Sequence, residues 1–217
     1  MAIDPAEVAR LILAGQAPPA AWIDDITELR LERSYITDLQ PVGALKQLRR
    51  LVLTRSRITD IAPLASLIRL RFLHLSYTAV SDLTPLTGLS ALEGCFLTGS
   101  LVEDIAPLAA LTRIERLDLG GTRISDAKPL AGLHNLRTLD LSGTGVTDIT
   151  PLAALTRLQY IDLAGTQVTD LSPLASLTDL QRLDLRSAKA TDLSPLAHMP
   201  RCEIVTKALI ARRRQVR

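Results

Sequence analysis

Residues 136–157 read LRTLDLSGTGVTDITPLAALTR, and this 22-residue pattern is repeated along most of the chain. Eight copies follow one another with no insertion or deletion, and a broken ninth copy begins at Cys202. Self-similarity at a fixed short period is the signature of a solenoid, in which each repeat is one structural unit. The residues at position 1 of the eight repeats are Ile26, Leu48, Leu70, Leu92, Ile114, Leu136, Leu158 and Leu180.

The first third of each repeat predicts a short strand. Positions 4 and 6 are apolar and position 5 between them is mostly polar, as in Leu139, Asp140 and Leu141. This alternation is typical of a strand with one buried face. Position 9 is Ser or Thr in seven of the eight repeats, and its hydroxyl can bond the backbone where the chain leaves the strand.

The remainder of each repeat predicts a turn and a short helical segment. Position 13 is Asp and position 16 is Pro in all eight repeats, and Pro suits the first turn of a helix. An Asp beside a turn favours bonds to local backbone donors, so we interpret this column as structural rather than as a calcium ladder. Four repeats offer a hydroxyl N-cap next to the proline: Thr84, Thr150, Ser172 and Ser194.

The pattern resembles the 22-residue class of leucine-rich repeats over residues 26–201. That class includes a regulatory subunit of type-1 protein phosphatase and the internalin surface proteins. The resemblance implies an α/β solenoid, a curved right-handed coil with parallel strands on the concave face and short 3₁₀ or α turns on the convex face. It also implies a protein-binding habit and brings no catalytic residues. Arg outnumbers Lys 21 to 4, which indicates a GC-rich bacterial genome.

The two ends are expected to cover the exposed core of the solenoid. Residues 1–25 predict a helical cap, with Asp4 as N-cap, Pro5 in the first turn, and Glu7 completing a capping box. Trp22 is expected to plug the first repeat. Residues 202–217 are expected to form a C-terminal cap and basic tail, in which residues 203–217 predict a last strand or a short basic helix, with Leu209 and Ile210 covering the final coil. The arginines of this basic tail are Arg212, Arg213, Arg214 and Arg217.

Composition narrows the classes of function. Only 3% of residues are aromatic against 47% hydrophobic, and the formal charge of +2 is too small to indicate a polyanion partner for the whole chain. Cys95 and Cys202 fall at apolar positions and are expected to be buried free thiols. No histidine shares a metal-binding motif with Cys or Asp, so we expect no metal, no cofactor and no enzymatic activity.

No basic start followed by an apolar run predicts a secretory signal, and no apolar run is long enough for a membrane span. We therefore expect a monomeric cytoplasmic protein that does not associate with a membrane. A secreted effector is the alternative.

The informative residues are those that the repeat does not dictate. Positions 3, 5 and 7 of such a strand point to the concave face, and position 8 lies at its rim. Repeats 2–4 place the only two phenylalanines there, with arginines beside them. Exposed aromatics next to Arg are typical interface anchors, although a solvated basic edge with stray aromatics is the other interpretation. The predicted partner-binding residues are Arg50, Val52, Arg55, Phe72, His74, Tyr77 and Phe96.

Position 5 of repeats 5–8 forms an acidic stripe: Asp118, Asp140, Asp162 and Asp184. Like charges on adjacent strands repel. The stripe is therefore either solvated consensus filler or a receptor for a basic partner.

These observations predict a module that binds an unidentified partner protein on its concave face, as a scaffold, a regulatory subunit or an effector. The alternative is binding of nucleic acid or another polyanion through the Arg-rich edge at residues 45–71 and the C-terminal tail. The acidic stripe makes nucleic acid the less favoured partner, since half of the concave face would repel phosphate.

Overall fold

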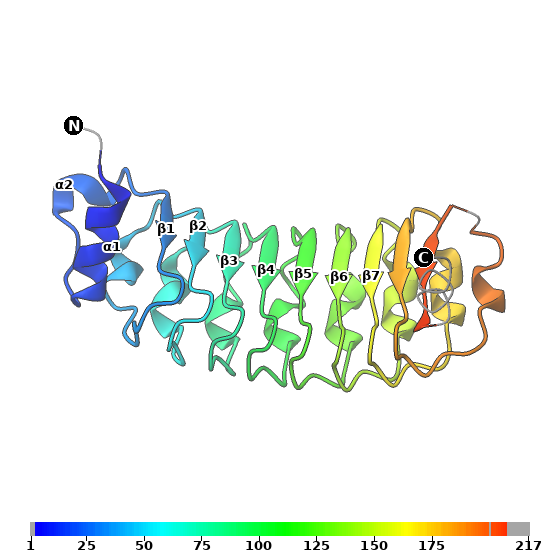
Figure 1. Ribbon diagram of the computed structural model, residues 1–217. Coiled ribbons are helices and arrows are strands. Elements are labelled where there is room, and N and C mark those ends of the chain that lie inside the picture. The colour runs from blue at the N-terminus through cyan, green and yellow to red at the C-terminus, as the bar shows by residue number, and fades with distance from the viewer. Residues whose placement is uncertain (1–2, 200, 208–217) are drawn as a thin grey trace, which may run out of the picture.

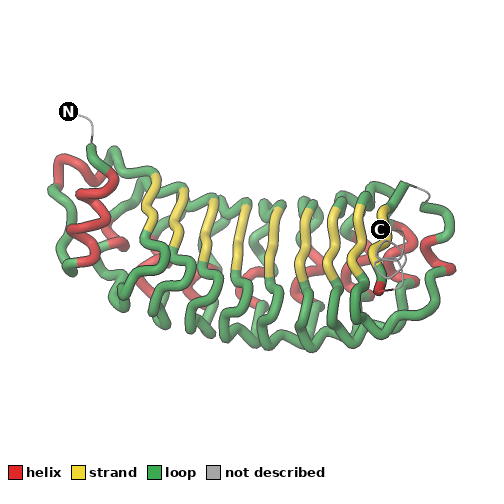
Figure 2. Tube along the Cα trace, in the orientation of Figure 1, coloured by secondary structure: helices red, strands yellow, loops and turns green. Residues whose placement is uncertain are grey.

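The computed structural model describes residues 3–199 and 201–207, which form one elongated solenoid that bows gently (Figures 1 and 2). Its strands make a single nine-stranded parallel sheet in which the spatial order equals the order along the chain. The α/β solenoid that the repeat predicts is confirmed. The strands are β1 (Glu28–Arg30), β2 (Arg50–Val52), β3 (Phe72–His74), β4 (Gly94–Phe96), β5 (Arg116–Asp118), β6 (Thr138–Asp140), β7 (Tyr160–Asp162), β8 (Arg182–Asp184) and β9 (Glu203–Val205).

Strands β1 to β8 stack in register because their spacing is always 22 residues, whereas β9 pairs one residue earlier than the repeat predicts, with Glu203 beside Arg182. Leu139 of β6 pairs with Leu117 on one side and Ile161 on the other, and all three side chains are buried.

Cys95 fills the same column in β4, where burial raises the pKa of its thiol to about 12. It is a free thiol that packs as a small apolar side chain, as predicted. Cys202 is also a free thiol but only half-buried, so the predicted burial is wrong there, because the pairing of β9 places it one residue away from the expected apolar position.

Short 3₁₀ segments line the side opposite the sheet (Figure 2). All eight Asp residues at position 13 accept a hydrogen bond from the backbone N–H two residues later, as Asp148 does from Thr150 at 2.8 Å. The structural interpretation of this column is thus confirmed. The segments are η1 (Val42–Ala44), η2 (Ala62–Ser66), η3 (Thr84–Leu86), η4 (Ala106–Leu108), η5 (Lys128–Gly132), η6 (Thr150–Ala154), η7 (Ser172–Ser176) and η8 (Ser194–Leu196).

The predicted hydroxyl N-caps are wrong. Thr84, Thr150, Ser172 and Ser194 are the first residues of their 3₁₀ segments, and the residue before each makes no side-chain cap. The carboxylate at position 13 satisfies the backbone donor instead, because it reaches that N–H from outside the segment.

The N-terminal cap consists of α1 (Pro5–Leu13) and α2 (Ala20–Ile23). Asp4 accepts from the backbone N–H of Ala6 at 2.9 Å, as an N-cap should. The expected capping box is absent, because Glu7 instead pairs with Arg10 at 2.7 Å. Trp22 lies in α2, half-buried against the core, as expected of a plug.

The C-terminal end continues the sheet. Glu203–Val205 pairs with β8 as the ninth strand, so the strand alternative is confirmed for these residues. Leu209, Ile210 and the four tail arginines lie outside the described residues.

Candidate functional site

The predicted partner-binding residues come from three neighbouring strands and the turns that follow them. We call the sheet side of the solenoid the strand face; it corresponds to the predicted concave face. In the sheet register Arg50 lies beside Phe72, and His74 lies beside Phe96. Arg55 and Tyr77 follow β2 and β3 at position 8. We call the cluster formed by Arg50, Arg55, Phe72, His74, Tyr77 and Phe96 the stacked patch.

Gly94 is the floor between the two phenylalanines. A Cβ atom at this position would lie 2.8 Å from the Phe72 ring and 3.0 Å from the Phe96 ring. Both rings therefore lean over the same glycine. His74 then stacks on Phe96 with ring centroids 4.3 Å apart and an interplanar angle of 6°.

Arg50 lies across the centre of the patch. Its guanidinium is 4.5 Å from the centroid of the Phe72 ring, and its Nη1 is 3.3 Å from Nε2 of His74. Burial, and then the charges of Arg50 and Arg30, lower the pKa of His74. The imidazole is therefore neutral at pH 7, which allows Nε2 to accept a hydrogen bond from Arg50.

The turns after the first three strands hold non-glycine residues in a left-handed backbone conformation. Arg33, Arg55 and Tyr77 have φ angles of 56°, 59° and 58°. Glycine occupies the same position in repeats 4–7, where φ is also positive. A side chain in this region costs about 1–2 kcal/mol relative to an ordinary backbone conformation. Repeats 1–3 therefore carry large side chains where the fold favours none.

Tyr77 and Arg55 continue the stack along this edge. A Cβ at Gly99 would lie 2.8 Å from the Tyr77 ring, so the ring rests on that glycine. The Arg55 guanidinium lies on the ring as well, 5.1 Å from its centroid. Tyr77 is nevertheless 52% exposed.

The structure corrects the predicted exposure of the patch. Phe72, His74 and Phe96 are half-buried rather than freely exposed, since each packs against a neighbour. Val52 is only 9% exposed and offers a partner almost no surface. The most accessible groups are the Arg55 and Tyr77 side chains, and Arg50 is half-buried.

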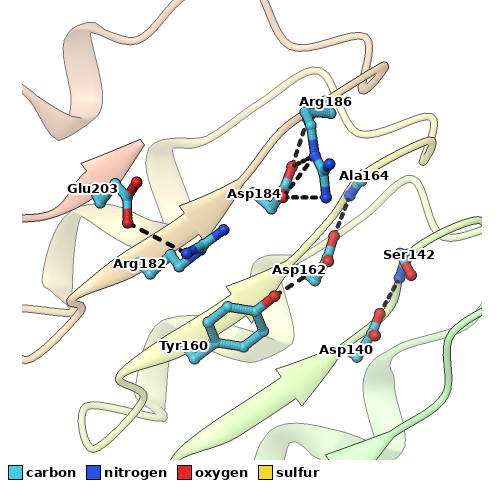
Figure 3. Close-up of polar contacts among 9 residues, drawn as sticks. All are labelled: Asp140, Ser142, Tyr160, Asp162, Ala164, Arg182, Asp184, Arg186 and Glu203. Atoms are coloured by element: carbon cyan, nitrogen blue, oxygen red, sulfur yellow. Dashed lines mark hydrogen bonds and ion pairs between the residues drawn. The ribbon is translucent and has the colours of Figure 1, made fainter. Parts of the chain in front are cut away.

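The acidic stripe is bonded to the backbone. Asp118, Asp140, Asp162 and Asp184 each accept from the N–H two residues later, at 2.8–3.1 Å, and Figure 3 shows the last three of these contacts. Asp162 is 8% exposed and Asp184 is fully buried. The interpretation as solvated filler is therefore wrong for these two residues.

Further groups compensate the charge of the stripe at its C-terminal end. Arg186 bonds Asp184 at 2.8 Å, and the Tyr160 hydroxyl donates to Asp162 at 3.3 Å (Figure 3). Burial is the main cause that raises the pKa values of Asp118 and Asp162 above the ordinary range. The stripe is thus partly a structural element of the turns, with Asp118 and Asp140 its more accessible members.

Comparisons with known proteins agree on the family. A family model described as leucine-rich repeats in two copies matches residues 112–154 and 156–198. Internalin C2 from Listeria monocytogenes superposes with a TM-score of 0.85 at 30% identity, and the match covers 92% of each chain. The chain belongs to the leucine-rich-repeat family.

Two other leucine-rich-repeat structures are similar. A second internalin of Listeria monocytogenes, inlF, has a TM-score of 0.74 at 28% identity over 92% of this chain and 66% of its own. A Leptospira interrogans protein has a TM-score of 0.71 at 23% identity, covering 82% of this chain and 46% of its own, and supports the fold alone. No curated protein matches significantly by sequence. Leucine-rich-repeat proteins generally mediate protein–protein interaction and are typically scaffolds rather than enzymes.

The described part of this leucine-rich-repeat chain contains no cluster of three or more His, Cys, Asp or Glu side chains that could hold a metal ion. None of its described helices is long and apolar enough to cross a membrane. A groove of 590 Å³ separates α1 from β1 and is lined by Ala6, Ala9 and Arg30 among others.

Sequence reasoning missed the stacked pair Tyr35 and Arg57 and the two glycines on which the rings rest. Tyr35 is 78% exposed, and the Arg57 guanidinium lies 4.6 Å from its ring centroid. Both residues occupy position 10, two residues beyond Arg33 and Arg55. The signal was present in the sequence, because Tyr35 and Arg57 occupy that position in two adjacent repeats.

Proposed function

We propose that this protein binds a partner protein through the stacked patch on the strand face of repeats 2–4. The observation that carries the proposal is the pair Arg55 and Tyr77, two large side chains held at positive φ where repeats 4–7 use glycine. Backbone strain that the fold does not need is typical of functional positions. The aromatic and Arg composition is that of interface anchors.

The surrounding geometry supports the same surface. The rings of Phe72 and Phe96 share one glycine floor, and the guanidiniums of Arg50 and Arg55 lie on aromatic rings. Such stacking holds the side chains in place before a partner arrives, which reduces the entropy lost on binding.

The test replaces the strained residues by the residue that the fold prefers. The double variant Arg55→Gly and Tyr77→Gly removes two anchors and relieves left-handed strain, so its thermal midpoint should be unchanged or higher. Partner binding should weaken by about 2 kcal/mol or more, the usual scale for anchor residues. Proteins captured from lysate by wild type and variant are compared by mass spectrometry, and the affinity of any patch-dependent partner is measured by calorimetry.

Ser187→Gly is the matched control. Ser187 has a φ of 62° at the same repeat position but lies in repeat 8, outside the patch. Its substitution should leave binding unchanged. Equal capture by wild type and by the Arg55 and Tyr77 double variant would contradict the proposal. Phe72 and Phe96 are unsuitable for this test, since they are half-buried and alanine there would also lower stability.

A further inference from the structure

The N-terminal half of the strand face carries arginines without carboxylate partners. Arg30 pairs with Glu28 and Arg71 pairs with Glu93. Within residues 3–199 and 201–207, no ion pair joins Arg33, Arg50, Arg55 or Arg57 to a carboxylate. Repeats 1–3 therefore present a surplus of positive charge beside and within the stacked patch.

Three of these four guanidiniums are mounted on aromatic rings. Arg50 lies over Phe72, Arg55 over Tyr77 and Arg57 over Tyr35, at 4.5, 5.1 and 4.6 Å from the ring centroids. A guanidinium that contacts a ring through one face keeps N–H donors at its edge for a further ligand. The fork geometry of those donors matches a carboxylate, which it can bind through two parallel hydrogen bonds.

Each ring of the patch already has one face against a neighbouring group. Phe72 lies between Arg50 and Gly94, Phe96 is covered by His74, and Tyr77 lies between Arg55 and Gly99. Nucleobases bind such surfaces by stacking on open aromatic faces. Phe72 and Phe96 are half-buried, so the accessible groups of the patch are mainly guanidinium edges and the Tyr77 side chain, and this surplus of N–H donors favours carboxylates over bases.

The acidic stripe restricts where an acidic ligand can lie. Asp118 is directly beside Phe96 in the sheet register, and Asp140 follows it. Their charges repel a negatively charged chain from repeats 5–8. The surface is therefore electrostatically favourable for a negatively charged ligand only as far as β4, which confines such a ligand to the strand face and edge of repeats 1–4.

We propose that the stacked patch takes an acidic segment of the partner protein, with Asp or Glu carboxylates bound to the guanidiniums of Arg50 and Arg55. This inference rests on the proposed function and specifies the chemistry of the partner. Arg57 on Tyr35 extends the same surface toward repeat 1.

The experiment uses the full chain and three fluorescently labelled probes of equal length: a glutamate-rich peptide, its glutamine counterpart and an oligothymidylate. Binding is measured by anisotropy at low and at physiological salt. We expect the glutamate peptide to bind and the glutamine peptide not to. The double variant Arg50→Gln and Arg55→Gln should bind the glutamate peptide about tenfold or more weakly. Arg113→Gln, which removes an exposed arginine in the turn before β5, should bind it as wild type does.

Arg50→Lys separates geometry from charge. Lysine keeps the charge but neither stacks as a plane nor binds a carboxylate with a fork of donors. Binding of the glutamate peptide by Arg50→Lys should therefore be weakened nearly as much as by the single variant Arg50→Gln, which is measured beside it. Thermal melts of every variant confirm that the fold is retained.

Several outcomes would overturn the inference. The glutamine peptide could bind equally well, Arg113→Gln could weaken binding as much as the patch variant, or the oligothymidylate could bind more tightly than the glutamate peptide. If the Arg55 and Tyr77 glycine variant loses a captured partner while the glutamate peptide does not bind wild type, the proposed function stands and the acidic segment is rejected. If that variant loses no partner, the proposed function itself fails.

Discussion

At the scale of single residues, the protein uses aspartate in two columns for the same purpose. The aspartates at positions 5 and 13 each accept from an N–H two residues later. The aspartates at position 13 are exposed. Those at position 5 become more buried toward the C-terminal end, until Asp184 is fully buried beneath Arg186. The same local bond therefore carries a growing desolvation cost along the stripe.

Two substitutions of Asp162 distinguish the contribution of its hydrogen bond to stability from that of its charge. Asp162→Ala removes the acceptor for the Ala164 N–H and should lower the free energy of unfolding by about 1–2 kcal/mol. Asp162→Asn keeps an acceptor oxygen and removes a desolvated charge beside Asp140 and Asp184, so at pH 7 it should be neutral or stabilising. Urea denaturation of both variants measures the difference. Equal losses would show that the charge itself contributes to stability.

At the scale of elements, the fold was predictable from the sequence and the site only in part. The invariant period determines which residues pair, so strand positions such as Leu139 beside Ile161 follow directly. The burial of Val52, Asp162 and Asp184 does not follow, because it depends on the side chains that neighbouring strands lay over them. The role of Gly94 as a floor was equally hidden, since it requires the directions of the Phe72 and Phe96 rings.

The cap of each 3₁₀ segment gives a test at this scale. Asp148→Ala should cost about 1 kcal/mol of unfolding free energy, since the Thr150 N–H loses its acceptor. Thr150→Ala should cost clearly less, because Thr150 is the first residue of η6 and not its cap. Urea midpoints of the two variants compare them. A larger loss for Thr150→Ala would restore the hydroxyl as the capping group.

At the scale of the whole molecule, stability is approximately a sum over repeats that contact only their neighbours. The array contains aspartates whose pKa values are shifted in opposite directions. Hydrogen bonds lower the pKa values of Asp82, Asp148 and Asp192, whereas burial raises those of Asp118 and Asp162. The two groups must respond to acid with opposite signs and in different pH ranges.

The two aspartates with raised pKa values predict that the free energy of unfolding increases on mild acidification. Between its raised folded-state pKa and the unfolded value of about 3.9, the folded state binds more protons, so stability rises as pH falls. The aspartates with lowered pKa values stabilise the fold at neutral pH, and this stabilisation is lost only as the pH falls below about 3.9. The double variant Asp118→Asn and Asp162→Asn should therefore exceed wild type in stability at about pH 7, and this gap should narrow toward about pH 4.5. Thermal midpoints across that range measure the gap, and a constant gap would contradict the assignment.

The column of glycines at position 8 has a consequence for how the molecule can change in length. Gly121, Gly143 and Gly165 have the same backbone conformation, and a Cβ on each would meet only the glycine of the preceding repeat, at 3.7–3.9 Å. At this position, each of repeats 5–7 therefore contacts the preceding repeat in the same way. Because the stacked patch ends at repeat 4 and its neighbour Asp118 lies in repeat 5, repeat 6 or repeat 7 could be excised or duplicated as a whole 22-residue unit while every patch residue kept its neighbours. The distance between the patch and the C-terminal end can thus change by whole repeats, through recombination, while the binding surface stays the same.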